Sequence, residues 1–321
     1  MQENKETIMK FRNIVAATAM LLSFGLATSK AYAAEDTTPV ITLGNSLSES
    51  QKKGTLEILK GALSDSNSYN TLTVTGDDLV TYLNPADNNF TSSSGVWSSA
   101  VIEKTSSGSG INVRILSYNG ENNITSITSD QYRNAAVTAG ISDANIYVTS
   151  ATPIDGSGAL AGIYKAYAKS GDKLNQKQIT AAQDELNTLS GINGENKDKD
   201  GYSDAQLNNA VAGAKKVMAD QGSGLTKDEI TKIVDDELAK NGLGSALTDA
   251  QKQQIINLLV EIANSGALNS PTFKKQAGQA MNAIQENAKD VFDKLNTEEN
   301  RNALQKLWDA VVEFFTSISL K

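Results

Sequence analysis

The sequence predicts an α+β fold, in which an N-terminal mixed α/β domain with a small sheet precedes an all-α C-terminal region. Short β-branched runs at 40–43 and 71–75 alternate with helical patterns up to about residue 170. After Gly171 these runs stop, and apolar residues recur at helical spacing. We therefore expect a signal peptide at 1–33, a mixed α/β domain at 34–170 and a helical domain at 171–321.

The first domain is predicted element by element. Ser48 and Gln51 form a capping box that opens a helix running to Leu63, and Gly140 ends another helix as its C-terminal cap. The Gly/Ser-rich segment 105–110 is typical of a hairpin loop between its two flanking strands. The expected strands are 40–43, 71–75, 97–104, 111–118 and 145–149, and the other helices are 77–83, 129–139 and 157–169.

The second domain is predicted to contain helices that begin with a hydrophobic residue followed by a capping box, as at Leu225-Thr226 and Leu247-Thr248. Helix stops are expected at glycines, among them the pair Ser190-Gly191. The expected helices are 174–189, 203–220, 226–240, 248–264, 272–295 and 297–318. The starts are spaced irregularly, so we favour ordinary capping over a helical repeat.

The N-terminus has the pattern of a secretory signal peptide. Lys10 and Arg12 precede an apolar run at 13–26, and Ala31-Tyr32-Ala33 forms a small-x-small cleavage site. An uncleaved anchor is the alternative, although the apolar run is short for a bilayer. We therefore expect an extracellular or cell-surface protein with no integral membrane segment after cleavage.

The chain contains neither histidine nor cysteine. This composition excludes disulfides, thiol nucleophiles, imidazole bases and zinc sites built on these residues. The net charge of −8 disfavours nucleic acid and anionic lipid as partners. Catalysis would therefore depend on carboxylates, hydroxyls or lysines, and we favour a protein without enzymatic activity.

Three sequence blocks resemble a known family. They are Gly108-Ser109-Gly110-Ile111-Asn112-Val113, the segment 124–141 with Gln131-Tyr132 and Asn134-Ala135-Ala136-Val137-Thr138-Ala139-Gly140, and the segment 156–167 with Gly162-Ile163-Tyr164-Lys165-Ala166-Tyr167. The chain resembles the secreted Gram-positive family known as domain of unknown function 1002, over most of the sequence from Val40 onward. The resemblance implies an exported or wall-associated protein with this α/β-then-helical layout. It implies no catalytic residues, because the family has no assigned activity.

An acidic segment resembles a calcium-binding EF-hand loop. Oxygen-bearing side chains fall at the first, third, fifth and ninth positions, and Gly201 stands at the sixth. Leu207 occupies the twelfth position, where the EF-hand has a bidentate glutamate, so a solvated interhelical loop is the favoured alternative. No cofactor is expected apart from calcium here, whose ligands would be Asn196, Asp198, Asp200 and Asp204.

Tyrosines gather in the α/β domain and suggest a binding face there, because their rings can stack on sugars or peptides. We expect this face at Tyr132, Tyr164, Lys165 and Tyr167, with core packing as the alternative.

The leading hypothesis is a non-catalytic binding or interaction protein of the cell envelope, with a wall polymer or an envelope protein as partner. The alternative is a carboxylate-dependent hydrolase of wall glycan or another extracellular polymer, with candidate carboxylates at Glu103, Glu121 and Asp155. A third hypothesis is a calcium-responsive structural protein. The residues indicate no particular oligomeric state.

Overall fold

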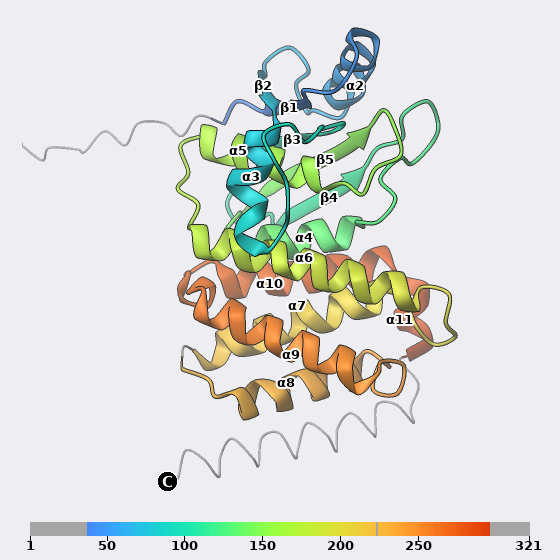
Figure 1. Ribbon diagram of the computed structural model, residues 1–321. Coiled ribbons are helices and arrows are strands. Elements are labelled where there is room, and N and C mark those ends of the chain that lie inside the picture. Colours follow the sequence, from blue (N-terminus) through green and yellow to red (C-terminus); the bar gives the residue numbers. More distant parts are fainter. Residues whose placement is uncertain (1–36, 223, 296–321) are drawn as a thin grey trace, which may run out of the picture. The chain divides into compact units, whose positions relative to one another are not determined.

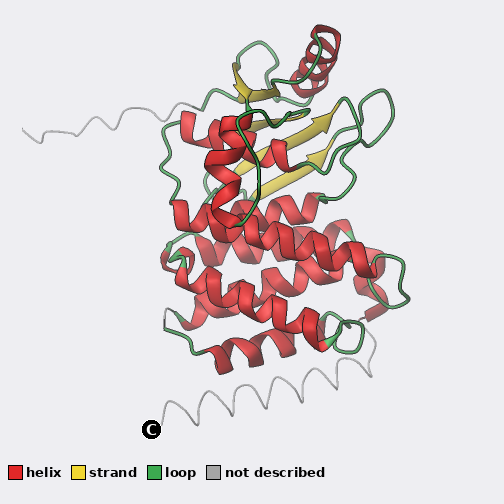
Figure 2. Ribbon diagram, viewed as in Figure 1, coloured by secondary structure: helices red, strands yellow, loops and turns green. Residues whose placement is uncertain are grey.

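Five strands of the described chain form one sheet in the N-terminal part of the protein (Figures 1 and 2). The computed structural model describes residues 37–222 and 224–295, so the predicted signal peptide and the predicted helix at 297–318 lie outside the described residues. The strand order is β2-β1-β3-β5-β4, with β3 antiparallel to both neighbours and the other two pairs parallel. The strands are β1 (Val40–Gly44), β2 (Asn70–Val74), β3 (Ser98–Lys104), β4 (Ile111–Ile115) and β5 (Ala144–Ser150).

The predicted hairpin at 105–110 is wrong, because β5 lies between β3 and β4. Val101 of β3 pairs with Tyr147, on the strand whose other edge pairs with β4. The loop crosses the end of β5 instead: the Thr105 N–H donates to the Asp143 carbonyl (2.8 Å), and the Ala144 N–H donates to the Gly110 carbonyl (3.0 Å). A six-residue loop leaves room for a strand that arrives later in the chain. In addition, β4 ends at Ile115, three residues earlier than predicted.

Helices cover both faces of the sheet. On one face lie α3 (Gly76–Leu83), α4 (Ser129–Thr138) and α5 (Ser157–Lys169), and η1 (Asn84–Ala86) follows α3. On the other face lies α2 (Glu49–Gly61), whose Leu59 joins Ile41, Val101 and Tyr147 in a smaller core. Gly162 lets α5 approach the sheet closely, since a Cβ there would lie 2.4 Å from the Thr42 Oγ1 atom.

The C-terminal part is helical, as predicted, with two differences in the helix boundaries. The helix α6 continues through Gly191 and Gly194 to Asn196, because the buried side chains of Leu189 and Ile192 hold it against its neighbours. The predicted helix at 272–295 is divided at Ala288. The helices are α6 (Gln176–Asn196), α7 (Asp204–Gln221), α8 (Lys227–Lys240), α9 (Asp249–Asn264), η2 (Ala267–Asn269), α10 (Phe273–Asn287) and α11 (Lys289–Leu295).

The helix α4 joins the two parts of the structure. Every residue from Gln131 to Thr138 is buried, and α4 contacts β4 as well as α6, α7 and α10 (Figure 1). The helix α10 also returns to the sheet, where Gln276 Nε2 donates to Asp143 Oδ1 (2.9 Å) and Gln279 Nε2 donates to the Gly108 carbonyl (2.6 Å). One hydrophobic core therefore extends from the sheet into the helices.

A buried ion pair fixes α4, α6 and α7 to one another. The side chains of Lys215 and Glu185 are both fully buried. The Lys215 ammonium donates to Glu185 Oε1 (2.8 Å), the Asn134 carbonyl (3.0 Å) and Thr138 Oγ1 (3.2 Å), and Thr138 Oγ1 donates to Glu185 Oε2 (2.5 Å). Burial lowers the pKa of Lys215, while the Glu185 charge opposes that change. All three ammonium hydrogens have an acceptor, so the charge is compensated inside the core.

Replacing Lys215 with methionine should destabilise the protein by about 3–5 kcal/mol, because the Glu185 carboxylate would stay buried without its cation. Urea unfolding measures this change. The double variant Lys215→Met, Glu185→Leu should recover most of the loss. As a control, Lys289→Met removes an exposed pair with Asp293 and should leave the free energy of unfolding almost unchanged. Equal effects of Lys215→Met and Lys289→Met would contradict this account.

Two glycines in helices should respond oppositely to alanine. Gly162→Ala should destabilise by about 1–3 kcal/mol, because the new methyl group would overlap Thr42. Gly191→Ala, in α6, has no atom within 4 Å of the new methyl group and should stabilise by about 0.5–1 kcal/mol. Thermal and urea unfolding of the two variants test the expectation. A stabilising Gly162→Ala would show that α5 does not lie this close to the sheet.

Candidate functional site

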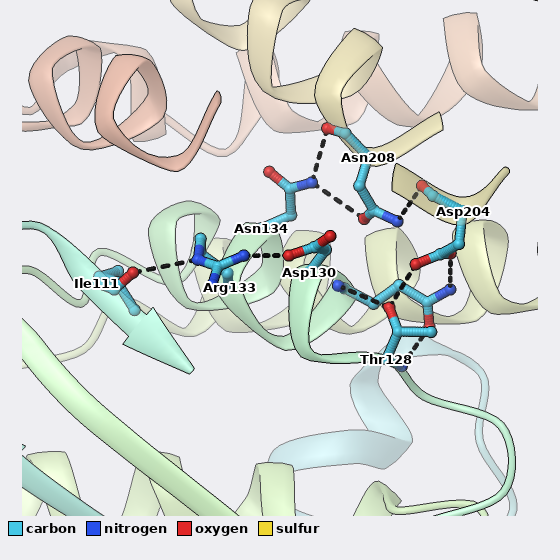
Figure 3. Close-up of polar contacts among 8 residues, drawn as sticks. Ile111, Thr128, Asp130, Arg133, Asn134, Asp204 and Asn208 are labelled. Atoms are coloured by element: carbon cyan, nitrogen blue, oxygen red, sulfur yellow. Dashed lines mark hydrogen bonds and ion pairs between the residues drawn. The ribbon is translucent and has the colours of Figure 1, made fainter. Parts of the chain in front are cut away.

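A group of polar contacts lies where the N-termini of α4 and α7 meet (Figure 3). Thr128 and Gln131 cap α4 with reciprocal hydrogen bonds. Asp204, the first residue of α7, accepts from Thr128 Oγ1 (2.6 Å) and from Gln131 Nε2 (2.8 Å). A carboxylate is favoured in the first turn of a helix, because the backbone N–H groups there are unpaired. Asp204 therefore holds the two helix starts together.

The Asp204 carboxyl group has an unusual acidity. Burial raises its pKa to about 6, and the hydrogen bonds from Thr128 and Gln131 oppose that rise. The nearby charge of Asp130 raises it further. The group therefore titrates near pH 6, and it faces the protein interior.

The same polar layer continues along α4 to the sheet (Figure 3). The fully buried Arg133 forms an ion pair with Asp130, and its Nε donates to the carbonyl of Ile111 in β4 (3.1 Å). On another side of α4, Asn134 Nδ2 donates to the carbonyl (3.0 Å) and the Oδ1 (3.1 Å) of Asn208. These contacts join β4, α4 and α7, so this layer serves the fold.

The predicted calcium ligands are divided among separate interactions. Asn196 is buried in the last turn of α6, where its Nδ2 donates to the Ile192 carbonyl (2.6 Å) and its Oδ1 accepts from Lys199 Nζ (2.7 Å). Asp198 and Asp200 are exposed, and Asp204 is directed toward α4. In the part of the chain that the structure describes, no three acidic residues form a group that could hold a metal ion. Calcium binding by this loop stays a prediction.

The predicted tyrosine face is not at the surface. Tyr132 and Tyr164 are fully buried, and 6% of Tyr167 is accessible. The Tyr132 hydroxyl donates to the Gly156 carbonyl (2.8 Å), so the ring is fixed in the core. Lys165 Nζ is engaged by Asp78 Oδ2 and by the Thr73 carbonyl, both at 2.8 Å. The aromatic spacing therefore marks the buried side of α5.

The three carboxylates proposed for a hydrolase lie at different places in the α/β part. Glu103 accepts hydrogen bonds from the backbone and side chain of Ser64 and from Asn145 Nδ2, and so fixes the loop after α2. Asp155 accepts from the N–H and hydroxyl of Ser157 at the start of α5. Glu121 is exposed in a turn with Tyr118. Glu103 and Asp155 therefore hold local structure.

A carboxyl pair that the sequence did not reveal links α6 to α9. Asp184 and Glu261 are hydrogen-bonded to each other, and the pKa of Asp184 rises to about 7. Burial is the largest cause, followed by the contact with Glu261 and the charge of Asp87. A cavity of about 330 Å³ opens beside Glu261 and Thr180. No local pattern could have found this pair, since it depends on how α6 packs against α9.

Two neighbouring cavities lie among α7, α8, α10 and α11. Their volumes are about 530 and 410 Å³, and both are lined by Lys240, Gln285 and Phe292. Lysines and carboxylates alternate around them, as in the ion pair between Lys240 and Glu237. This mixture of charges does not select one ligand chemistry.

No helix in the described ranges 37–222 and 224–295 combines the length and hydrophobicity needed to cross a bilayer.

Comparison with known proteins identifies the family. The family described as protein of unknown function (DUF1002) matches residues 43–280, from β1 into α10. The chain belongs to this family. A relative, the uncharacterized protein YpuA of Bacillus subtilis (strain 168), is 33% identical over 281 residues, which cover 87% of this chain and 86% of the relative. No solved structure matches significantly. The family resemblance drawn from the sequence is thereby confirmed.

The Asp184 carboxyl group should make this DUF1002 protein less stable as the pH rises. Its pKa is raised on folding, so the stability from its protonated form is complete below about pH 4 and is lost as the pH rises through about 7. The unfolding free energy of the wild type should fall over this pH range. In Asp184→Asn this fall should be smaller by about 1–2 kcal/mol, a figure that allows for solvent screening at a partly exposed site.

Urea unfolding of wild type and variant at a series of pH values measures the effect. Asp198→Asn, in the exposed loop after α6, is the matched control and should leave the pH dependence unchanged. Parallel curves for wild type and Asp184→Asn would contradict the prediction.

Proposed function

We propose that the protein is exported and acts in the bacterial envelope as a binding protein without catalytic chemistry of its own. The signal-peptide pattern at 1–33 supports export, and the lack of histidine and cysteine removes the commonest catalytic groups. The observation that carries the proposal is the internal use of the buried charged groups. Lys215 with Glu185, Arg133 with Asp130 and Asp204 with its helix caps all stabilise the fold.

The partner is a wall polymer or an envelope protein. The chain has 37 acidic against 29 basic side chains, and this excess repels polyanions. A neutral glycan or peptide strand therefore fits the protein better than a phosphate-rich polymer does.

A hydrolase of wall glycan or another extracellular polymer is the second candidate, and the Asp184–Glu261 pair favours it. Two carboxyl groups that share a proton, as in aspartic proteases, can act as general acid and general base on a peptide bond, whereas glycan hydrolysis needs carboxyl groups at least about 5 Å apart. Asp184 retains its proton close to neutral pH, and Glu261 is exposed beside a cavity. Catalysis would then lie in the helical part, away from the carboxylates that the sequence suggested.

One experiment separates the two candidates. The protein from residue 34 onward is incubated with purified Gram-positive cell wall, and both the sedimented protein and the soluble fragments are quantified. Binding without fragment release is the expected result. Fragment release that is lost in Asp184→Asn and in Glu261→Gln would instead establish the hydrolase. A protein that neither sediments with the wall nor releases fragments would remove wall polymer as the partner.

A further inference from the structure

Trp97 stands out on the surface of the described chain. Among the described residues, 37–222 and 224–295, Trp97 is the one large hydrophobic residue that is exposed, with 36% of its surface accessible. Its neighbours Val96 and Ser98 both face Gly158 of α5, since a Cβ on that glycine would lie 2.7 Å from Val96 Cγ1 and 2.9 Å from Ser98 Oγ. Because side chains alternate along an extended chain, Trp97 points to the opposite face of the sheet.

The indole ring is held in place before any ligand arrives. The Val96 N–H donates to Ser46 Oγ (2.9 Å), and the Ser46 N–H donates to the Val96 carbonyl (3.0 Å). The ring lies against Gly95, where a Cβ would be 2.3 Å from the indole Cη2 atom and 2.5 Å from Cζ3. A fixed aromatic ring loses little conformational entropy on binding, which favours affinity.

Three chain segments near Trp97 are rich in hydroxyl groups. Segments 44–48, 91–98 and 150–154 meet here, through the bonds between Ser46 and Val96 and the pairing of Ser98 with Ser150. None of these segments contains Asp, Glu, Lys or Arg, although the chain has 29 basic and 37 acidic side chains. We call these three segments the Trp97 edge.

The chemistry of this edge selects one class of ligand. An exposed indole ring offers an apolar surface for stacking, and the exposed side chain of Asn45, next to the Ser46 that bonds to Val96, offers an amide group for hydrogen bonding. The charged residues that adjoin these segments, Glu49 and Asp155, are acidic, so they would repel an anionic ligand. A sugar ring presents apolar C–H groups on its faces and hydroxyl groups around its rim.

We propose that the Trp97 edge binds a neutral glycan segment, with a sugar ring stacked on the indole of Trp97. This inference rests on the proposed binding function and names its site and ligand class. The ring supplies the stacking surface, and the side chains of segments 44–48 and 91–98 bond to the sugar hydroxyls.

Tryptophan fluorescence tests the site directly. The chain has two tryptophans, so Trp308→Phe leaves Trp97 as the sole indole reporter. Neutral chitotetraose should change the Trp97 emission saturably, whereas an oligogalacturonate of similar length, which is anionic, should leave it unchanged. Trp97→Ala should bind purified wall about tenfold more weakly or worse, at an unchanged melting temperature, because the stacking contribution is lost.

Matched variants make the test specific. Gly95→Ala should also weaken binding, because its methyl group displaces the indole, whereas Gly191→Ala should bind as the parent does. Trp97→Tyr keeps an aromatic ring and should retain part of the affinity. Wall binding by Trp97→Ala equal to that of the parent would overturn the Trp97 edge while leaving the proposed function intact. If the parent binds no wall and no chitotetraose, both the site and wall glycan as its partner fall.

Discussion

The structure depends on hydrogen bonds and ion pairs made by the side chains of α4, a helix buried along most of its length. A buried hydrogen-bonding group without a partner costs free energy, and a buried charge without one costs more. Partners reach α4 from both parts of the chain: the Ile111 carbonyl from the sheet, and Glu185, Lys215 and Asp204 from the helices. Separating the sheet from the helices would therefore leave these groups unpaired. The two parts stabilise each other through this one helix.

This constraint bears on where function can lie. The pKa of Lys215 is lowered and the pKa of Asp204 is raised to about 6. In an unfamiliar enzyme such shifts would mark candidate catalytic residues, but here burial is the largest cause of both. Altered acidity indicates a functional site when the group also faces a cleft, and Lys215 and Asp204 face other side chains. Asp184 differs because its partner Glu261 is exposed beside a cavity.

Elements coded by local signals were predictable from the sequence. Capping boxes at Ser48, Thr226 and Thr248 start helices as predicted, because each is complete within four residues. The hairpin at 105–110 and the helix stop at Gly191 failed because strand partners and helix length depend on residues distant in the chain. The tyrosine face failed for a related reason: helical spacing shows that residues share a side of α5, and not whether that side is buried.

The candidate site residues could likewise be predicted from the sequence only where the signal is local. Asp184 and Glu261 meet through helix packing, so no local pattern identifies them. Trp97 could have been noticed in the sequence, because it is one of two tryptophans and lies in the serine-rich, uncharged segment 91–98. The family match spans residues 43–280 and so includes every partner of α4 together with the Trp97 edge. Most of the buried core therefore lies within the family match, and Val40, Ile41 and Ile284 are buried just outside it.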